Sequence, residues 1–280
     1  MHQLQSSIVF STVSSEHAAK DNDLQMINST LYPLSYNGIA SLLSLSLYDK
    51  IIYPQISSNP SMGLFDGMND VYDMAQKYIG IVLNLATRCS EHPCETDKAV
   101  FIMLYMADHI KNVVVSPSDL DKMIPGPCGN EASFPVSRII EIISTVASTC
   151  PDPTVRFAAC KLIEKFINYG DEKTQLFLFD ELLIRCPYPS MKVAAIQLLK
   201  DHVCRILEEK KFSSAFASPV VLTEFVPIIL QFKEQWAVNQ YELWNDYSYI
   251  MQAIVFYRIL YLKDIQQSLV KTTCTMKAVP

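Results

Sequence analysis

The sequence predicts an all-α protein in which helical hairpins repeat, and three observations support this fold class. Half of its 280 residues are apolar, which is enough to bury a large core. Only seven are glycines, so folds that need many tight turns or glycine-rich phosphate loops are disfavoured. The segments that begin at Cys150 and Cys186 resemble one another at a separation of 36 residues, which predicts two tandem hairpins within 137–211.

The part of the chain that precedes the repeat is expected to hold one helical hairpin. Residues 1–65 are weakly organised, with one expected helix at 39–47, and their start resembles a truncated edge of something longer. Over 66–114, apolar residues recur at three- and four-residue steps on both sides of Pro93, which predicts two paired helices. Four prolines and two glycines in 115–136 predict a loop or linker.

Alignment of the repeat places CPDPTVRFAACKLI over CPYPSMKVAAIQLL, with six identities in fourteen positions. Each copy is expected to have a first helix (138–149 and 174–185), a Pro-x-Pro break and a second helix (153–168 and 189–208). Proline lacks an amide proton and cannot continue a helix, but it is favoured in the first turn of the next one. The period, the break, the basic residue and the alanine pair are typical of HEAT-like repeats, which stack into an α-solenoid. A generic helical bundle is the alternative.

The C-terminal helices are expected within 212–265, followed by a mobile tail, 266–280. After a Ser/Ala-rich break, an apolar helix is expected at 221–232, and 234–264 predicts one long helix or two kinked ones. The aromatic residues of this last stretch are expected to form the packing face of a capping helix. A partner-binding face is the alternative, because Trp and Tyr dominate binding hot spots. These residues are Trp236, Tyr241, Trp244, Tyr247, Tyr249, Phe256, Tyr257 and Tyr261.

No catalytic constellation is recognisable in the sequence, which lacks phosphate-loop, zinc-protease and serine-nucleophile motifs. We therefore expect no enzyme activity and no cofactor. Cys89, His92 and Cys94 could contact a metal, but their spacing is not a recognised zinc pattern, so buried or solvated helix-end residues are expected. The net charge of −6 without a basic stripe argues against direct nucleic-acid binding.

No secretory signal or membrane span is expected, since the longest purely apolar run, 99–107, has nine residues. A cytoplasmic location follows, with the nucleus as a second site. The eight cysteines are then expected to be free thiols. Cys150 and Cys186 are expected at helix C-termini, where the helix dipole opposes a thiolate, so redox activity is not expected of them.

Cations on the second helices of the repeat are the candidate partner-binding residues. They lie off the apolar stripes and could form a mildly basic ridge on an acidic protein. A merely solvated face is the alternative and the commoner case. The candidates are Arg156, Lys161, Lys165, Lys192, Lys200 and Arg205.

The repeat and the segment after it resemble the fungal Yap-binding proteins, which are grouped with animal glomulin and plant ALF-type proteins. Two copies of CP-x-P-x-(V/M)-(R/K)-x-AA, at 150–159 and 186–195, and a FASPxxL element at 216–222 carry the match. The resemblance extends over 137–232. Family members are longer, so it implies that the chain corresponds to the C-terminal part of the family's length.

The resemblance implies a HEAT-like, non-enzymatic scaffold that works through protein partners. In the fungal branch, which the FASP element favours, the family assists peroxide-driven activation of a basic-zipper stress transcription factor. This factor or its oxidant is therefore the expected partner. The alternatives are a kinetochore-associated scaffold and, as in glomulin, a regulator that binds the RING subunit of cullin-RING ubiquitin ligases.

Overall fold

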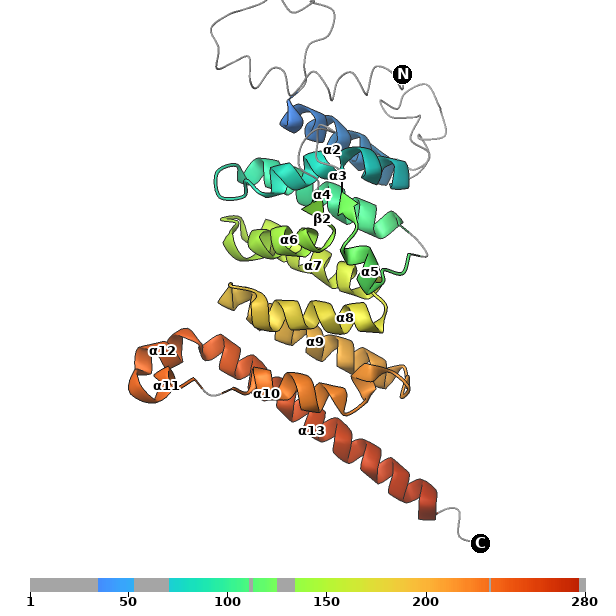
Figure 1. The fold of residues 1–280 in the computed structure, drawn as a ribbon, viewed down its shortest axis with the longest axis vertical. Helices are drawn as coiled ribbons and strands as arrows, with labels where there is room; N and C mark the ends of the chain where they lie inside the picture. Colours follow the sequence, from blue (N-terminus) through green and yellow to red (C-terminus); the bar gives the residue numbers. More distant parts are fainter. Residues whose placement is uncertain (1–34, 53–70, 111–112, 125–133, 232, 277–280) are drawn as a thin grey trace, which may run out of the picture. The chain divides into compact units, whose positions relative to one another are not determined.

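The computed structural model describes residues 35–52, 71–110, 113–124, 134–231 and 233–276, and these residues are mostly helical (Figure 1). The predicted all-α class is confirmed. The chain divides into two compact units, Met1–Asp171 and Glu172–Pro280. This boundary falls between the two copies of the repeat, so each copy contributes its hairpin to a different unit. None of the described helices is long and apolar enough to cross a membrane.

The first unit is built from helices and one small strand pair. Its described helices are α2 (Tyr36–Ile52), α3 (Val71–Ala86), α4 (Pro93–His109), α5 (Pro117–Leu120), α6 (Ser137–Thr149) and α7 (Pro153–Tyr169). The strands β1 (Met123–Ile124) and β2 (Phe134–Pro135) pair antiparallel, with Met123 opposite Pro135. Helix α2 contains the helix expected at 39–47, whereas most of the expected N-terminal segment 1–65 lies outside the described residues.

The long apolar run of the sequence is explained by the surroundings of α4. This helix packs against α2, α3 and α7, so it has neighbours on several sides. Val100, Ile102 and Met103 are accordingly all buried, although they point in different directions around the helix. Lys98 lies at the edge of this packing, where its Nζ donates to Asn37 Oδ1 of α2 at 2.7 Å. The apolar run is therefore the centre of the unit's core.

The region 115–136, expected as a loop or linker, contains a short helix and both strands. Pro117 begins α5, as its fixed φ favours in a first helical turn. The backbone amide of Ser116 donates to Asp119 Oδ2 at 2.8 Å, and the Ser116 hydroxyl contacts the same oxygen at 2.7 Å. These contacts cap the start of α5. The number of prolines in the segment, on which the loop prediction is based, does not reveal such a cap.

The Pro-x-Pro breaks of the repeat separate helices where the sequence predicts. Helix α6 ends at Thr149 and α7 begins at Pro153, with Asp152 Oδ1 accepting from the Thr154 amide at 2.7 Å. The two helices pack together, α7 also packs against α4, and Ala159 of α7 is fully buried. A small side chain at such a buried position lets a neighbouring helix approach α7 closely.

The second unit repeats this arrangement and adds a helical C-terminal part. Its described helices and helical turns are α8 (Glu172–Asp180), η2 (Glu181–Arg185), α9 (Pro189–Glu208), η3 (Ala215–Ala217), η4 (Val221–Phe225), α10 (Val226–Ile229), α11 (Gln235–Val238), α12 (Gln240–Asn245) and α13 (Tyr247–Met276). The helix expected at 174–185 is α8 continued by the π-helical turn η2, which packs against α9.

An aromatic cluster forms the core of the second unit. The ring of Phe179 lies edge-on to Phe216, with centroids 5.8 Å apart, and to Phe225 at 6.4 Å. His202 lies edge-on to Phe216 at 4.4 Å. All four side chains are buried. The cluster brings α8, α9, η3 and η4 together, and edge-to-face contacts of this kind stabilise cores beyond their buried area.

The stretch expected as one long helix or two kinked ones, 234–264, is two short helices followed by a long one. Asn239 separates α11 from α12, and its side chain accepts from the Tyr241 amide at 3.0 Å. Helix α13 then continues to Met276, so residues 266–276, expected in the tail, are helical. The reason is local, because no proline or glycine occurs in α13 to end it. Residues 277–280 of the expected tail lie outside the described residues.

Candidate functional site

The basic residue shared by both copies of the repeat folds back onto its own hairpin. Arg156 Nη1 donates to the carbonyl of Cys150 at 2.7 Å and to that of Pro151 at 3.0 Å. Lys192, at the equivalent position, donates to the carbonyl of Ile184 at 3.1 Å. The last carbonyls of a helix lack partners within it and carry partial negative charge. Both cations therefore cap the first helix of their hairpin.

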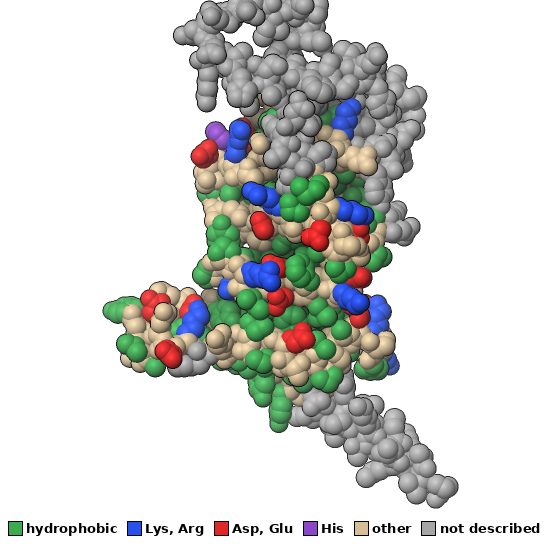
Figure 2. All heavy atoms as spheres, viewed as in Figure 1, with side chains coloured by type: hydrophobic (Ala, Val, Ile, Leu, Met, Phe, Trp, Pro, Cys, Tyr) green, Lys and Arg blue, Asp and Glu red, His purple; other side chains and the backbone are tan. Residues whose placement is uncertain are grey.

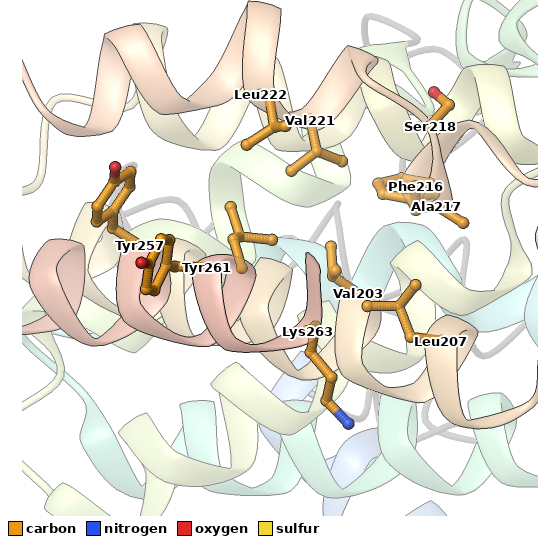
Figure 3. Close-up of a pocket in the computed structure, with 11 residues that line it drawn as sticks. Val203, Leu207, Phe216, Ala217, Ser218, Val221, Leu222, Tyr257, Tyr261 and Lys263 are labelled. Carbon is orange, nitrogen blue, oxygen red and sulfur yellow. The ribbon is translucent and has the colours of Figure 1, made fainter. Parts of the chain in front are cut away.

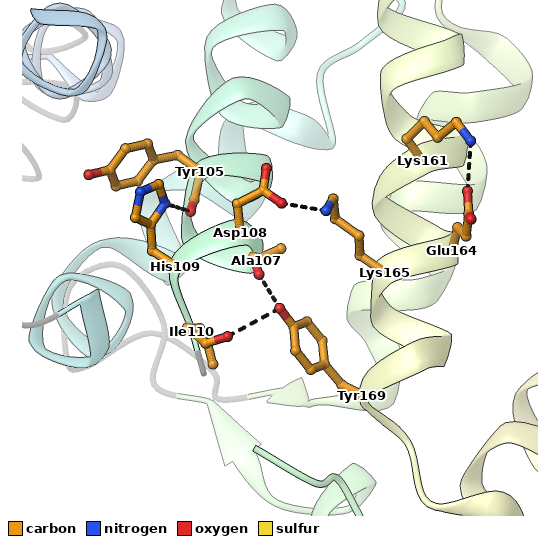
Figure 4. A network of polar contacts seen from close by, with 9 residues as sticks. All are labelled: Tyr105, Ala107, Asp108, His109, Ile110, Lys161, Glu164, Lys165 and Tyr169. Atoms are coloured by element: carbon orange, nitrogen blue, oxygen red, sulfur yellow. Dashed lines mark hydrogen bonds and ion pairs between the residues drawn. The ribbon is translucent and has the colours of Figure 1, made fainter. Parts of the chain in front are cut away.

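Two other candidate cations lie on α7 and have carboxylate partners (Figure 4). Lys161 pairs with Glu164 at 2.8 Å on its own helix. Lys165 pairs with Asp108 of α4, and this hydrogen bond raises the pKa of Lys165 above its ordinary value. Beside this ion pair, the Tyr169 hydroxyl donates to the Ala107 carbonyl at the end of α4. These contacts join α7 to the C-terminal end of α4.

The last two candidates lie on α9 and contact neighbours on the same helix. Lys200 donates to Gln197 Oε1 at 2.8 Å, and its side chain is only 15% exposed. Arg205 donates to His202 Nδ1 at 2.8 Å. All six candidate cations thus have a partner within their own unit. A role for them in binding another protein stays a prediction.

The thiols at the two Pro-x-Pro breaks, Cys150 and Cys186, are buried, whereas Cys160 and Cys204 are half-buried. Burial raises the pKa of both Cys150 and Cys186, so these thiols are protonated at neutral pH. Burial raises the pKa of Cys160 and Cys204 as well. Within the described ranges, no group of three His, Cys, Asp or Glu side chains is placed to hold a metal ion, the segment around Cys89 included.

The aromatic residues of the C-terminal helices are mostly at the surface. Phe256 is buried, and Trp236 and Tyr249 are half-buried. The others are exposed, so the expected packing face is wrong for them: Tyr241, Trp244, Tyr247, Tyr257 and Tyr261. In the space-filling view, hydrophobic side chains gather over α10 and the adjoining part of α13 (Figure 2).

One exposed line of side chains runs along α13. It is formed by Tyr247, Met251, Ile254, Arg258 and Tyr261, and we call these five residues the α13 stripe. Steps of four, three, four and three residues place them on one side of a helix. On another side of α13, Ala253 and Phe256 are buried, where the helix packs against α9. This part of α13 is therefore apolar on two sides, of which only one is covered.

A groove of about 260 Å³ lies beside the stripe, between α9, the η3–η4 segment and α13 (Figure 3). Its lining residues are Val203, Leu207, Phe216, Ala217, Ser218, Val221, Leu222, Tyr257, Leu260, Tyr261 and Lys263. Val221 and Leu222 point from η4 toward the helix that carries Tyr257 and Tyr261 (Figure 3). The FASPxxL element, noted in the sequence only for its resemblance, thus supplies one wall of the groove.

A polar contact holds the α11–α12 segment to the start of α13. Asp246 Oδ2 accepts from Lys233 Nζ at 2.7 Å and from Trp236 Nε1 at 2.9 Å. Although burial raises the pKa of Asp246, these two hydrogen bonds lower it below its ordinary value. The Lys233 ammonium also lies 5.7 Å from the Tyr249 ring centroid. Helices α11 and α12 bury no residue themselves, and Tyr241 and Trp244 of α12 are exposed.

The sequence predicts a partner-binding face only as the alternative, through Tyr247 and Tyr261, and it does not reveal the other residues of the stripe or the groove. The available signal was an excess of apolar residues in 247–262, too many for one packing face. The groove left no signal, because its walls come from separate segments of the chain that only folding brings together.

Comparison with known proteins places these features in a family. Residues 132–276, slightly more than half of the chain, match the family model Kinetochor_Ybp2, described as YAP/Alf4/glomulin. No curated protein and no solved structure matches the chain. The matched segment contains both copies of the repeat, the groove and the α13 stripe. The chain therefore belongs to the YAP/Alf4/glomulin family.

Proposed function

We propose that the chain is a non-enzymatic adaptor of the Yap-binding type, which assists activation of a basic-zipper transcription factor during oxidative stress. The observation that carries this proposal is the exposed apolar surface of α12 and α13, inside the segment that matches the family. Exposed Tyr and Trp side chains are typical of protein-binding sites, since they bury a large area at a small cost in conformational entropy.

The state of the two repeat thiols, Cys150 and Cys186, supports an adaptor over a redox role for these cysteines. Peroxide reacts with thiolates, and reactive cysteines are accessible with a lowered pKa. Cys150 and Cys186 have the opposite properties, because both are buried and burial raises their pKa. Such a chain would help oxidation by holding the factor near its oxidant.

The rest of the proposal follows from the repeat and the family. We propose that the two hairpins stack as HEAT-like units of an α-solenoid, with the C-terminal helices capping it. The proposed partners are the transcription factor or its oxidant, without direct contact to nucleic acid or membrane. The proposed location is the cytoplasm, with the nucleus as a second site.

The test is deletion of the gene, followed by thiol trapping of the transcription factor after peroxide treatment. Cells without the gene should be peroxide-sensitive and should keep the factor reduced, and a plasmid copy should restore oxidation. Normal oxidation kinetics in the deletion strain would contradict the proposal.

The name and description of the matching family model also refer to the kinetochore and to glomulin, and each suggests another role. A glomulin-like regulator would co-purify with the RING subunit of a cullin ligase and lower its activity in a reconstituted ubiquitination assay. A kinetochore-associated scaffold would instead be enriched at centromeric chromatin by immunoprecipitation. Either result, together with normal oxidation of the factor, would replace the proposed function.

A further inference from the structure

We propose that the α13 stripe and the neighbouring groove bind an amphipathic helix of a partner protein, and that a carboxylate on the apolar side of this helix pairs with Arg258. This inference rests on the proposed adaptor function and adds the chemistry of the partner. The geometry, the size of the groove and the charges on α13 each support it.

The geometry of the stripe suits a helical partner. Met251, Ile254 and Tyr261 are 39%, 51% and 59% exposed, and they lie along one line of a single helix. A partner helix with apolar residues at positions i, i+3 or i+4, and i+7 presents a matching line. Leu262, at the edge of the stripe, is 47% exposed and widens the apolar surface.

The size of the groove suits side chains. Its volume of about 260 Å³ lies below the range of roughly 300–1,000 Å³ that small-molecule sites occupy. Phe216 and Val203 line its interior, whereas Leu222, Tyr257 and Tyr261 are themselves exposed. Because Tyr261 belongs to both the groove and the stripe, a partner on the stripe can insert an apolar anchor into the groove.

The charges of α13 select the kind of helix. Between Asp246 and Asp264 the chain has no carboxylate, and its two charged residues there are Arg258 and Lys263. Lys263 lies 3.9 Å from Glu208, whereas Arg258 is exposed and forms no ion pair within the described part of the chain. Covering Arg258 with a purely apolar surface would leave a buried unpaired charge, which is costly. A partner carboxylate removes this cost.

The same charges argue against a second copy of this chain as the occupant. In a symmetric pair, each α13 stripe would face another α13 stripe, since two-fold interfaces use the same surface on both subunits. The stripe offers no carboxylate to Arg258. An acidic helix of a different protein is therefore the better match.

Binding can be measured with the purified full chain and two fluorescently labelled synthetic helices. The helices share leucines spaced to match the stripe and differ only in a central Glu or Lys on the apolar side. By fluorescence anisotropy, the chain should bind the Glu helix about fivefold more tightly than the Lys helix, the size of a modest ion pair. Arg258→Glu should reverse this preference.

Two further variants separate specific binding from loss of fold. Ile254→Glu should abolish binding of both helices, whereas Phe157→Glu, at a similarly exposed apolar position on α7, 65% against 51%, should leave binding unchanged. Circular dichroism should show unaltered helix content in all three variants. Reversal by Arg258→Glu in itself requires a folded chain, because the variant must gain affinity for the Lys helix.

Three results would overturn the inference: equal affinity for the two helices, no binding of either, or an unchanged preference in Arg258→Glu. Sedimentation showing a dimer that Ile254→Glu dissociates would also overturn it, in favour of a second copy. These results do not depend on the stress pathway. Preference for the Glu helix with normal factor oxidation in the deletion strain would contradict the adaptor function alone.

Discussion

At the scale of single residues, His202 links the stability of the second unit to pH. It is buried against Phe216 and Phe179, and its Nδ1 accepts from Arg205. Burial first, and the charge of Arg205 second, lower its pKa to about 4 from an ordinary 6.5. The folded chain therefore keeps this imidazole neutral.

The sign of the resulting pH dependence follows from where the proton binds. Between pH 6.5 and 4 the unfolded chain takes up a proton that the folded chain does not, so stability falls as pH falls. From pH 7 to pH 5, His202 should lower the free energy of unfolding by about 2 kcal/mol. Thermal unfolding of His202→Phe should show a smaller change over this interval, and an identical change would contradict the assignment.

The sequence identifies Arg156 as the basic residue of the repeat, but it does not reveal that this residue caps a helix. The sequence places a basic residue at the same position of both copies, and an outward ridge was one interpretation. Its hydrogen bonds to Cys150 and Pro151 depend on the path of the chain through the break. Sequence periodicity predicts the side of a helix to which a residue's Cβ points. It does not predict where the charged end of a long side chain lies.

Replacement of Arg156 tests its structural role. Arg156→Gln should lower the free energy of unfolding by about 1–2 kcal/mol, since it removes charge-assisted bonds to helix-end carbonyls. Lys161→Gln, which removes an exposed ion pair on the same helix, should cost less than about 0.5 kcal/mol. Urea denaturation measures both, and equal effects would argue against capping by Arg156.

At the scale of elements, the helix boundaries of the repeat could be predicted because proline acts locally. The predicted second helices, 153–168 and 189–208, correspond closely to α7 and α9. The surface of α13 could not be predicted in the same way. Its apolar residues point in several directions, and only packing against α9 determines that Phe256 is covered and Ile254 is not.

The packing of α7 makes a prediction at this scale. Ala159 is fully buried, whereas Ala158 beside it is half-buried. Ala159→Leu should overpack the core around α7, which packs against α4 and α6, and destabilise the chain by about 1–3 kcal/mol. Ala158→Leu should cost clearly less in the same urea titration. Equal costs would mean that the buried position of Ala159 does not require a small side chain.

At the scale of the whole molecule, each unit has its own core, and the family match extends across both. The candidate partner surface lies within the second unit, and the six cations proposed from the sequence are divided between the two units. Fold class and family could be read from the sequence, because composition, period and proline breaks carry them. The groove could not, since α9, η4 and α13 meet only in the folded chain.

The central claim is that the exposed face of α13 recruits the partner whose oxidation the chain assists. The most direct measurement is the oxidation state of the transcription factor after peroxide, in deletion cells that express Ile254→Glu or the control Phe157→Glu at equal levels. The account predicts a reduced factor with Ile254→Glu and an oxidised factor with Phe157→Glu. Full oxidation of the factor in cells that carry Ile254→Glu would contradict it.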